Sequence, residues 1–182
     1  MKQAGALLVV FLALAACSQG PSADNPYAPG LKKNGEAVDG LVVGNRLMAA
    51  GEYDLALEAF SRAALTHGMS ADVLAGLGTA NLGLGRLGQS EELLRQALEL
   101  DGKSPEIWNN LGVVLIEQGK NAEAEQFFRR AYALDNGESD SIRDNLRLAL
   151  AKLENSDYGE AQEQDYKVVR RGSGEFVIRK IP

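Results

Sequence analysis

Cysteine, histidine and aromatic residues are scarce in this sequence of 182 residues, which holds one cysteine, one histidine and 6% aromatics. A single cysteine cannot form a disulfide within the chain. The single histidine, His67, lacks the partners that a general base or a metal ligand needs. Acidic clusters have helical spacing with arginines nearby, which is typical of a solvated helix face. We therefore expect no catalytic site, no metal site and no cofactor.

Positively charged residues are also fewer than acidic ones, since the chain has 19 lysines and arginines and 25 aspartates and glutamates, which gives a net charge of −6. Nucleic-acid binding needs a concentrated positive surface, so we expect no nucleic-acid partner. The glycine-rich stretch at residues 76–85 imitates a phosphate-binding loop, but it lacks the Lys-Ser/Thr pair and no strand precedes it. We therefore expect no small-molecule substrate either.

No hydrophobic run here reaches the roughly 20 residues that a membrane-spanning helix needs. The apolar stretch from Ala4 to Ala13 follows a short basic start and predicts a signal peptide over residues 1–16. The segment Leu14-Ala15-Ala16-Cys17 resembles the lipobox of bacterial lipoproteins, in which the cysteine is diacylated and becomes the first residue. The alternative is an ordinary signal peptide whose cysteine is accidental.

Lipidation of Cys17 would hold the chain at a membrane surface without spanning it. By resemblance to Gram-negative lipoproteins, Ser18 in place of an aspartate implies sorting to the outer membrane, on its periplasmic face. Residues 17–36 are rich in proline and glycine and predict a flexible linker between the lipid and a folded domain.

Small residues recur every 34 positions, which is the strongest pattern in the chain. Three sets share this period: Gly44, Gly78 and Gly112; Gly51, Gly85 and Gly119; Ala63, Ala97 and Ala131. A period of this length predicts stacked helical hairpins with a concave binding surface. The units are residues 37–70, 71–104 and 105–138, and residues 139–155 predict a helix that caps the stack.

The third unit shows most clearly which family these repeats resemble. Its pattern is Trp108, Leu111, Gly112, Ala124, Phe128 and Ala131. It resembles the tetratricopeptide repeat (TPR) family, whose unit is a helix-turn-helix of 34 residues. The resemblance implies an all-α superhelical solenoid that binds proteins and is not an enzyme.

In this family the inner face is lined mainly by the first helix of each unit. Carried onto this sequence, that rule predicts a partner-binding groove of mixed character, lined by Leu41, Asn45, Met48, Asp72, Ala75, Thr79, Leu82, Glu106, Asn109, Val113 and Ile116. The groove lacks the lysines and arginines with which some relatives grip the C-terminal carboxylates of chaperones. We expect an extended or helical apolar segment with basic flanks as its ligand. The alternative is that some of these side chains merely pack against the cap helix.

The C-terminal residues 156–182 form a separate module. An acidic stretch is followed by two β-prone runs on either side of Arg171-Gly172-Ser173-Gly174, which predicts a β-hairpin. A lone hairpin is only marginally stable in water, so it should dock on the solenoid or pair with a partner. Our hypothesis is strand addition to a partner.

The complete layout of lipobox, linker, three repeats and β-prone tail resembles the TadD lipoproteins of the Flp, or tight-adherence, pilus system. That resemblance implies an adaptor in the cell envelope, similar to the pilotins that bring a pilus secretin to the outer membrane. The alternative within the same class is a periplasmic scaffold for peptidoglycan hydrolases or proteases, as in NlpI-like lipoproteins. The sequence leaves the partner and the pathway open.

Replacing the predicted acylation site tests the lipid anchor. Cys17→Ala should abolish incorporation of labelled palmitate and move the protein from the membrane fraction to the soluble fraction, because the thiol is the acceptor of the acyl chains. Unchanged labelling and fractionation would show that Cys17 is not lipidated.

Overall fold

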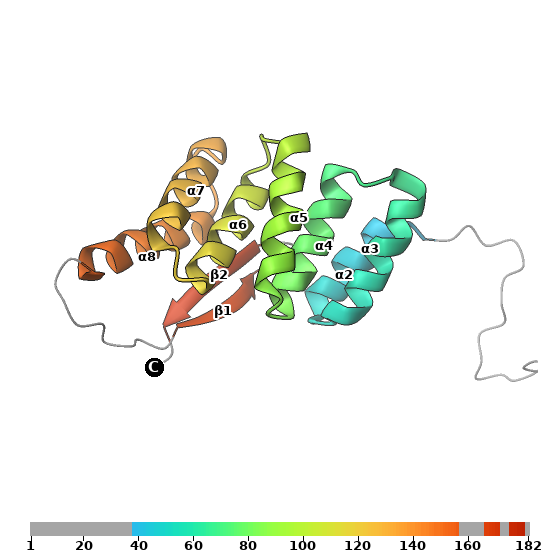
Figure 1. Cartoon of the computed structure of the whole chain (residues 1–182), viewed down its shortest axis with the longest axis horizontal. Coiled ribbons are helices and arrows are strands. Elements are labelled where there is room, and N and C mark those ends of the chain that lie inside the picture. Colours follow the sequence, from blue (N-terminus) through green and yellow to red (C-terminus); the bar gives the residue numbers. More distant parts are fainter. Residues whose placement is uncertain (1–37, 157–165, 172–174, 181–182) are drawn as a thin grey trace, which may run out of the picture. The chain divides into compact units, whose positions relative to one another are not determined.

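The computed structural model describes residues 38–156, 166–171 and 175–180 of the chain (Figure 1). The predicted signal peptide, Cys17 and the predicted linker at residues 17–36 lie outside these residues. Helices dominate the described part and follow one another as antiparallel hairpins. They are α2 (Gly40–Ala50), α3 (Tyr53–His67), α4 (Ala71–Gly83), α5 (Leu87–Leu100), α6 (Pro105–Glu117), α7 (Asn121–Leu134) and α8 (Asp140–Ser156). The predicted all-α solenoid of three helix pairs and a capping helix is confirmed.

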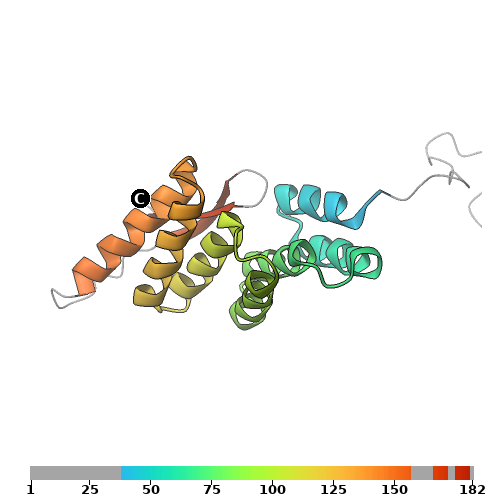
Figure 2. The same ribbon diagram turned by 90° about the horizontal axis from the view of Figure 1, so that it is seen from above.

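The first helices of the three pairs form an inner row. Helix α4 packs against α2 and against α6, and α6 in turn packs against α8. Each second helix packs on its own first helix and on the first helix of the next pair, so α3, α5 and α7 form an outer row (Figure 2). No helix among the described residues is both long and apolar enough to cross a membrane.

Glycines of the inner helices receive bulky side chains from the outer row. A Cβ atom built on Gly44 would lie 2.5 Å from the ring of Phe60, and one built on Gly76 would lie 2.6 Å from the same ring. Gly112 is related to Phe128 in the same way, at 2.6 Å. Both rings are buried. The 34-residue glycine period is therefore the imprint of close packing between paired helices.

A second set of glycines ends the inner helices. Gly51, Gly85 and Gly119 have φ values of +79°, +71° and +76°, in the left-handed region where a side chain is strained. Their backbone N–H groups donate to carbonyls of the preceding helix turn. The chain can then reverse within a few residues, as the turn glycines in the sequence predict.

Helix starts also follow the sequence signals. The hydroxyl of Ser104 accepts a hydrogen bond from the N–H of Ile107 at 3.4 Å, and Pro105 occupies the first turn of α6. Ser70 caps α4 in the same manner.

The C-terminal module is a two-stranded antiparallel hairpin, as predicted. Strand β1 (Tyr166–Arg171) pairs with β2 (Glu175–Lys180), with Val168 opposite Ile178 and Arg170 opposite Phe176. Helices α6 and α8 pack against β2. Phe176, Val177 and Ile178 are all buried, so the hairpin is docked on the solenoid and extends its core.

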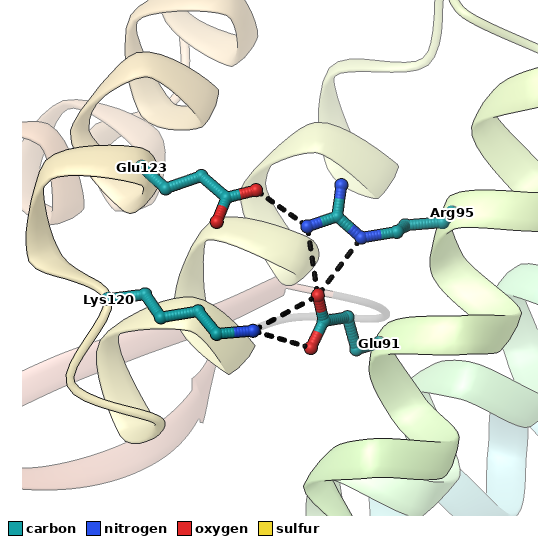
Figure 3. Close-up of polar contacts among 4 residues, drawn as sticks. All are labelled: Glu91, Arg95, Lys120 and Glu123. Carbon is teal, nitrogen blue, oxygen red and sulfur yellow. Dashed lines mark hydrogen bonds and ion pairs between the residues drawn. The ribbon is translucent and has the colours of Figure 1, made fainter.

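An ion-pair network joins the second helix pair to the third (Figure 3). The guanidinium of Arg95 on α5 donates to Glu91 one turn away, at 2.9 Å, and to Glu123 on α7, at 2.6 Å. Lys120, just before α7, contacts the other oxygen of Glu91 at 3.1 Å. Arg95 also lies over the ring of Phe127, 5.5 Å from its centroid.

Glu91 is the most perturbed carboxyl of this network. Burial acts to raise its pKa, but hydrogen bonds from Gln118, Arg95 and Lys120 outweigh burial and lower the pKa from 4.5 to about 2. The network therefore stabilises the contact between α5 and α7 as long as Glu91 is ionised.

The glycine packing predicts opposite effects for two substitutions. Gly112→Ala places a methyl group against the buried Phe128 ring and should lower the free energy of unfolding by about 1–3 kcal/mol. Gly88→Ala on α5 is the matched control, since nothing lies within 4 Å of its added Cβ, and it should raise that free energy by about 0.5–1 kcal/mol. Urea unfolding monitored by circular dichroism measures both. Equal effects would contradict the packing argument.

The Glu91 network predicts a pH-dependent loss of stability. The folded pKa of about 2 lies below the unfolded value of 4.5, so the contribution is complete above pH 4.5 and is lost as the pH falls toward 2. Glu91→Gln should therefore be less stable than the wild type at pH 6, with the difference in unfolding free energy shrinking between pH 4.5 and pH 2.5. A difference that stays constant over that range would show that the ionised carboxylate is not the stabilising group.

Candidate partner-binding groove

A pocket of about 310 Å³ opens on the inner row of helices. All three helix pairs contribute to its walls, which are formed by Leu41, Asn45, Met48, Phe60, Asp72, Ala75, Gly76, Thr79, Ser104, Glu106, Ile107 and Asn110. Gly76 leaves space beside the Phe60 ring, and this places an aromatic surface from the outer row in the wall of the inner face. The apolar floor is thus formed jointly by helices of both rows.

Seven of the eleven predicted groove residues line this pocket: Leu41, Asn45, Met48, Asp72, Ala75, Thr79 and Glu106. Asn45, Asp72 and Glu106 are exposed, whereas Met48 is 2% exposed and forms part of the floor. The rim is acidic, since the lining residues include Asp72 and Glu106 but no lysine or arginine. An apolar ligand with neighbouring positive charge complements this surface.

The other four predicted residues, Leu82, Asn109, Val113 and Ile116, do not line the pocket. Each is at most 5% exposed. Leu82, Val113 and Ile116 belong to the same apolar cluster as Phe176 and Ile178 of the hairpin. A partner cannot contact these side chains while β2 is docked on α6 and α8.

Strand β2 is held on the solenoid through its backbone. The side-chain amide of Asn145 on α8 donates to the carbonyl of Phe176 at 2.6 Å, and its oxygen accepts from the N–H of Ile178 at 3.1 Å. Asn109 on α6 donates to the same Phe176 carbonyl at 3.3 Å. Both asparagines are fully buried. One side chain thereby bonds two backbone groups of a strand as a neighbouring strand would.

The start of β2 is fixed at the first turn of α8. The Ser139 hydroxyl lies 3.1 Å from both carboxylate oxygens of Glu175 and also accepts from the N–H of Ile142. A carboxylate beside a helix N-terminus is favoured by the helix dipole. Charge and hydrogen bonding therefore set the position of β2 along α8.

Side-chain amides connect the pocket with the hairpin. Asn110, which lines the pocket, donates to the Thr79 hydroxyl at 3.3 Å and accepts from Asn109 at 3.3 Å. Asn145 donates to Asn109 at 2.8 Å. Such a buried network fixes the relative positions of α4, α6, α8 and β2, since each amide left unpaired would be costly.

Asn110 and Asn145 are site residues that the repeat pattern did not predict. A signal was present, because Asn109-Asn110 and Asn145 stand among the apolar residues of amphipathic helices. A polar residue at a core position needs a partner, but the partners here lie more than 30 residues away in the chain. They are Thr79 for Asn110 and the backbone of β2 for Asn109 and Asn145.

Within the part of the chain that the structure describes, titratable residues form no constellation suited to metal binding. Across the described ranges, no group of three or more His, Cys, Asp or Glu side chains is placed to hold an ion. His67 at the end of α3 contacts the carboxylate of Asp39 at 2.8 Å and so joins the two ends of the first helix pair.

Comparisons with known proteins agree with this geometry. The sequence model of the tetratricopeptide repeat family matches residues 43–105 and 76–139. Among solved structures, the chain is similar to the TPR domain of Sgt2 from Aspergillus fumigatus, with a TM-score of 0.63, 22% identity, and coverage of 85% of this chain and 99% of that one.

Two further structures share the fold. The second TPR domain of human RPAP3, in complex with the HSP70 peptide SGPTIEEVD, has a TM-score of 0.55 and 25% identity, covering 63% of this chain and 94% of that one. The translocator chaperone SycD of Yersinia enterocolitica has a TM-score of 0.56 and 18% identity, covering 63% and 92%. No curated protein sequence matches the chain.

The family model covers more than half of the chain, and its two matches span all three helix pairs. Glycines at a 34-residue period, helix pairs stacked in two rows and a pocket on the inner row all follow from that repeat. The chain belongs to the tetratricopeptide repeat family, and its fold is that of a protein–protein interaction module.

Proposed function

We propose that the inner-row pocket binds an extended apolar segment of a protein partner, with basic residues beside it. The observation that carries this proposal is the composition of the pocket, where Leu41, Met48 and Phe60 offer apolar contact beneath the carboxylates of Asp72 and Glu106. The same inner surface already holds an extended strand of this chain through its backbone. An extended ligand therefore suits the spacing and chemistry of this face.

The likeness to RPAP3 supports a peptide ligand, since that TPR domain was solved with a peptide. The ligand proposed here differs in charge. The RPAP3 peptide SGPTIEEVD is acidic, and the pocket of this chain has no lysine or arginine among its lining residues. Acidic side chains at the rim disfavour such a peptide and favour a basic flank.

We propose further that the protein is a lipid-anchored adaptor at the periplasmic face of the outer membrane, similar to the pilotins and to TadD in Flp pilus assembly. The support is the lipobox that ends in Cys17, followed by a proline- and glycine-rich linker and the TPR domain. Its proposed partner is the outer-membrane secretin of the pilus. The tether would place the pocket within reach of proteins that assemble at that membrane.

Site-specific photocrosslinking in intact cells tests the pocket and the partner together. A photoreactive amino acid at Asn45, exposed within the pocket, should form an adduct with the secretin, identified by mass spectrometry. The matched control is the same amino acid at Leu65 on α3, which is 88% exposed and lies outside the pocket. Identical adducts from both positions would contradict binding in the pocket.

Deleting the gene separates the pilus proposal from its alternative. Loss of secretin multimers from the outer-membrane fraction is the expected result. Normal secretin multimers together with altered peptidoglycan cross-linking would overturn the pilotin proposal and favour a scaffold for cell-wall hydrolases.

A further inference from the structure

The docked hairpin has two edges, and they differ in what they contact. On β2, the Phe176 carbonyl and the Ile178 N–H point away from β1 and are bonded by Asn109 and Asn145. The outer edge of β2 is thereby capped by side chains of α6 and α8. On β1, no further strand is paired within the ranges that the structure describes.

The register shows which backbone groups β1 presents at its second edge. In an antiparallel pair of strands, the residues of a non-hydrogen-bonded pair lie opposite each other, and both direct their N–H and C=O groups away from the partner strand. Phe176 and Ile178 do so, and they lie opposite Arg170 and Val168. The N–H and C=O groups of Val168 and Arg170 therefore face away from β2, at the second edge of β1.

Side chains at these two positions face the solenoid. Val168 and Arg170 share a face with Ile178 and Phe176, because residues directly opposite in a sheet point to the same side. Val168 packs against the main apolar cluster. A strand added beside β1 would thus meet an apolar residue and a cation on its inward face.

Two nitrogen atoms of the Arg170 guanidinium have no acceptor among the described residues. Its Nε and Nη2 atoms are shielded from solvent and have no hydrogen-bond partner within the described part of the chain. Burial lowers the pKa of the guanidinium and outweighs the opposite effect of Tyr53, so the surroundings as a whole disfavour its positive charge. The edge formed by Nε and Nη2 is the one that binds a carboxylate through two parallel hydrogen bonds.

The charge of β1 selects the kind of strand that can be added. Its sequence Tyr166–Arg171 contains Lys167, Arg170 and Arg171 and no acid. Two copies of this strand side by side would repel one another, since like charges on neighbouring strands are destabilising. An acidic strand is attracted and also supplies the carboxylate that Arg170 lacks.

We propose that the second edge of β1 is a docking site for an extended acidic segment of a partner protein, which adds to the hairpin as a third strand with a carboxylate on Arg170. This site is separate from the pocket, whose lining includes neither Val168 nor Arg170. Backbone pairing with β1 provides affinity, and the alternation of an acidic and an apolar residue on the inward face provides specificity.

A designed peptide tests this site directly. The probe is the fluorescent, terminally blocked peptide Ser-Thr-Glu-Thr-Val-Thr-Ser, which in antiparallel pairing can place its glutamate opposite Arg170 and its valine opposite Val168. Its binding to the full chain is measured by fluorescence anisotropy. The same peptide with lysine in place of glutamate should bind at least tenfold more weakly. Equal binding of both peptides, or no binding of the glutamate peptide, would overturn the proposal.

Variants of the chain assign the binding to the edge of β1. Arg170→Glu should reverse the preference between the two peptides. Val168→Pro removes the outward N–H and should abolish binding. Val168→Ala loses the two methyl groups of the side chain but keeps the N–H, and it should bind within about threefold of wild type. Hydrogen exchange of residues 175–180 verifies that the hairpin remains docked in both. Equal affinities of the two Val168 variants would overturn the proposal.

A variant in the pocket separates this site from the pocket. Asn45→Arg, which alters the pocket alone, should leave binding of the glutamate peptide unchanged. Loss of binding in Asn45→Arg would place the peptide in the pocket and would contradict the assignment to β1. Failure of the β1 proposal would leave the photocrosslinking test of the pocket unaffected.

Discussion

The close approach of inner and outer helices at glycine is the constraint on which the rest of the structure depends. Phe60 lies against Gly44 of its own pair and against Gly76 of the next, so one ring joins two repeats. A side chain at either glycine would force the helices apart, and interiors packed to crystal-like density have no room to adjust. The stacking of the inner row on the outer row and the aromatic wall of the pocket follow from these contacts.

Burial of asparagine gives the inner surface a second property. Asn109 and Asn145 bond to the backbone of β2, where the Phe176 carbonyl and the Ile178 N–H point away from β1 and need partners. The hairpin thereby closes one part of the inner surface and leaves the pocket open in another. A repeat fold that usually offers one continuous groove here offers two distinct surfaces, an acidic-rimmed pocket and the basic strand β1.

Much of the fold could be predicted from local pattern. The 34-residue period, the turn glycines with positive φ and the serine caps act over a few residues or over one repeat, so the sequence reveals them directly. The groove was harder to predict. Ala75 and Thr79 of the second unit line the pocket as the repeat rule predicts, but Asn109 and Val113, at the equivalent places in the third unit, are buried in the chain itself. The rule describes a solenoid with an empty inner face and takes no account of a segment that docks there.

The sequence by itself determined the helix pairs, their order and the alternation of small and large residues that stacks them, because each of these depends on residues close together in the chain. It also determined that the tail forms a hairpin, since two β-prone runs surround a glycine turn. Only the tertiary structure decided where that hairpin lies and which of its edges is capped. Those outcomes depend on hydrogen bonds such as Asn145 to Phe176, between residues 31 positions apart, which no local pattern specifies.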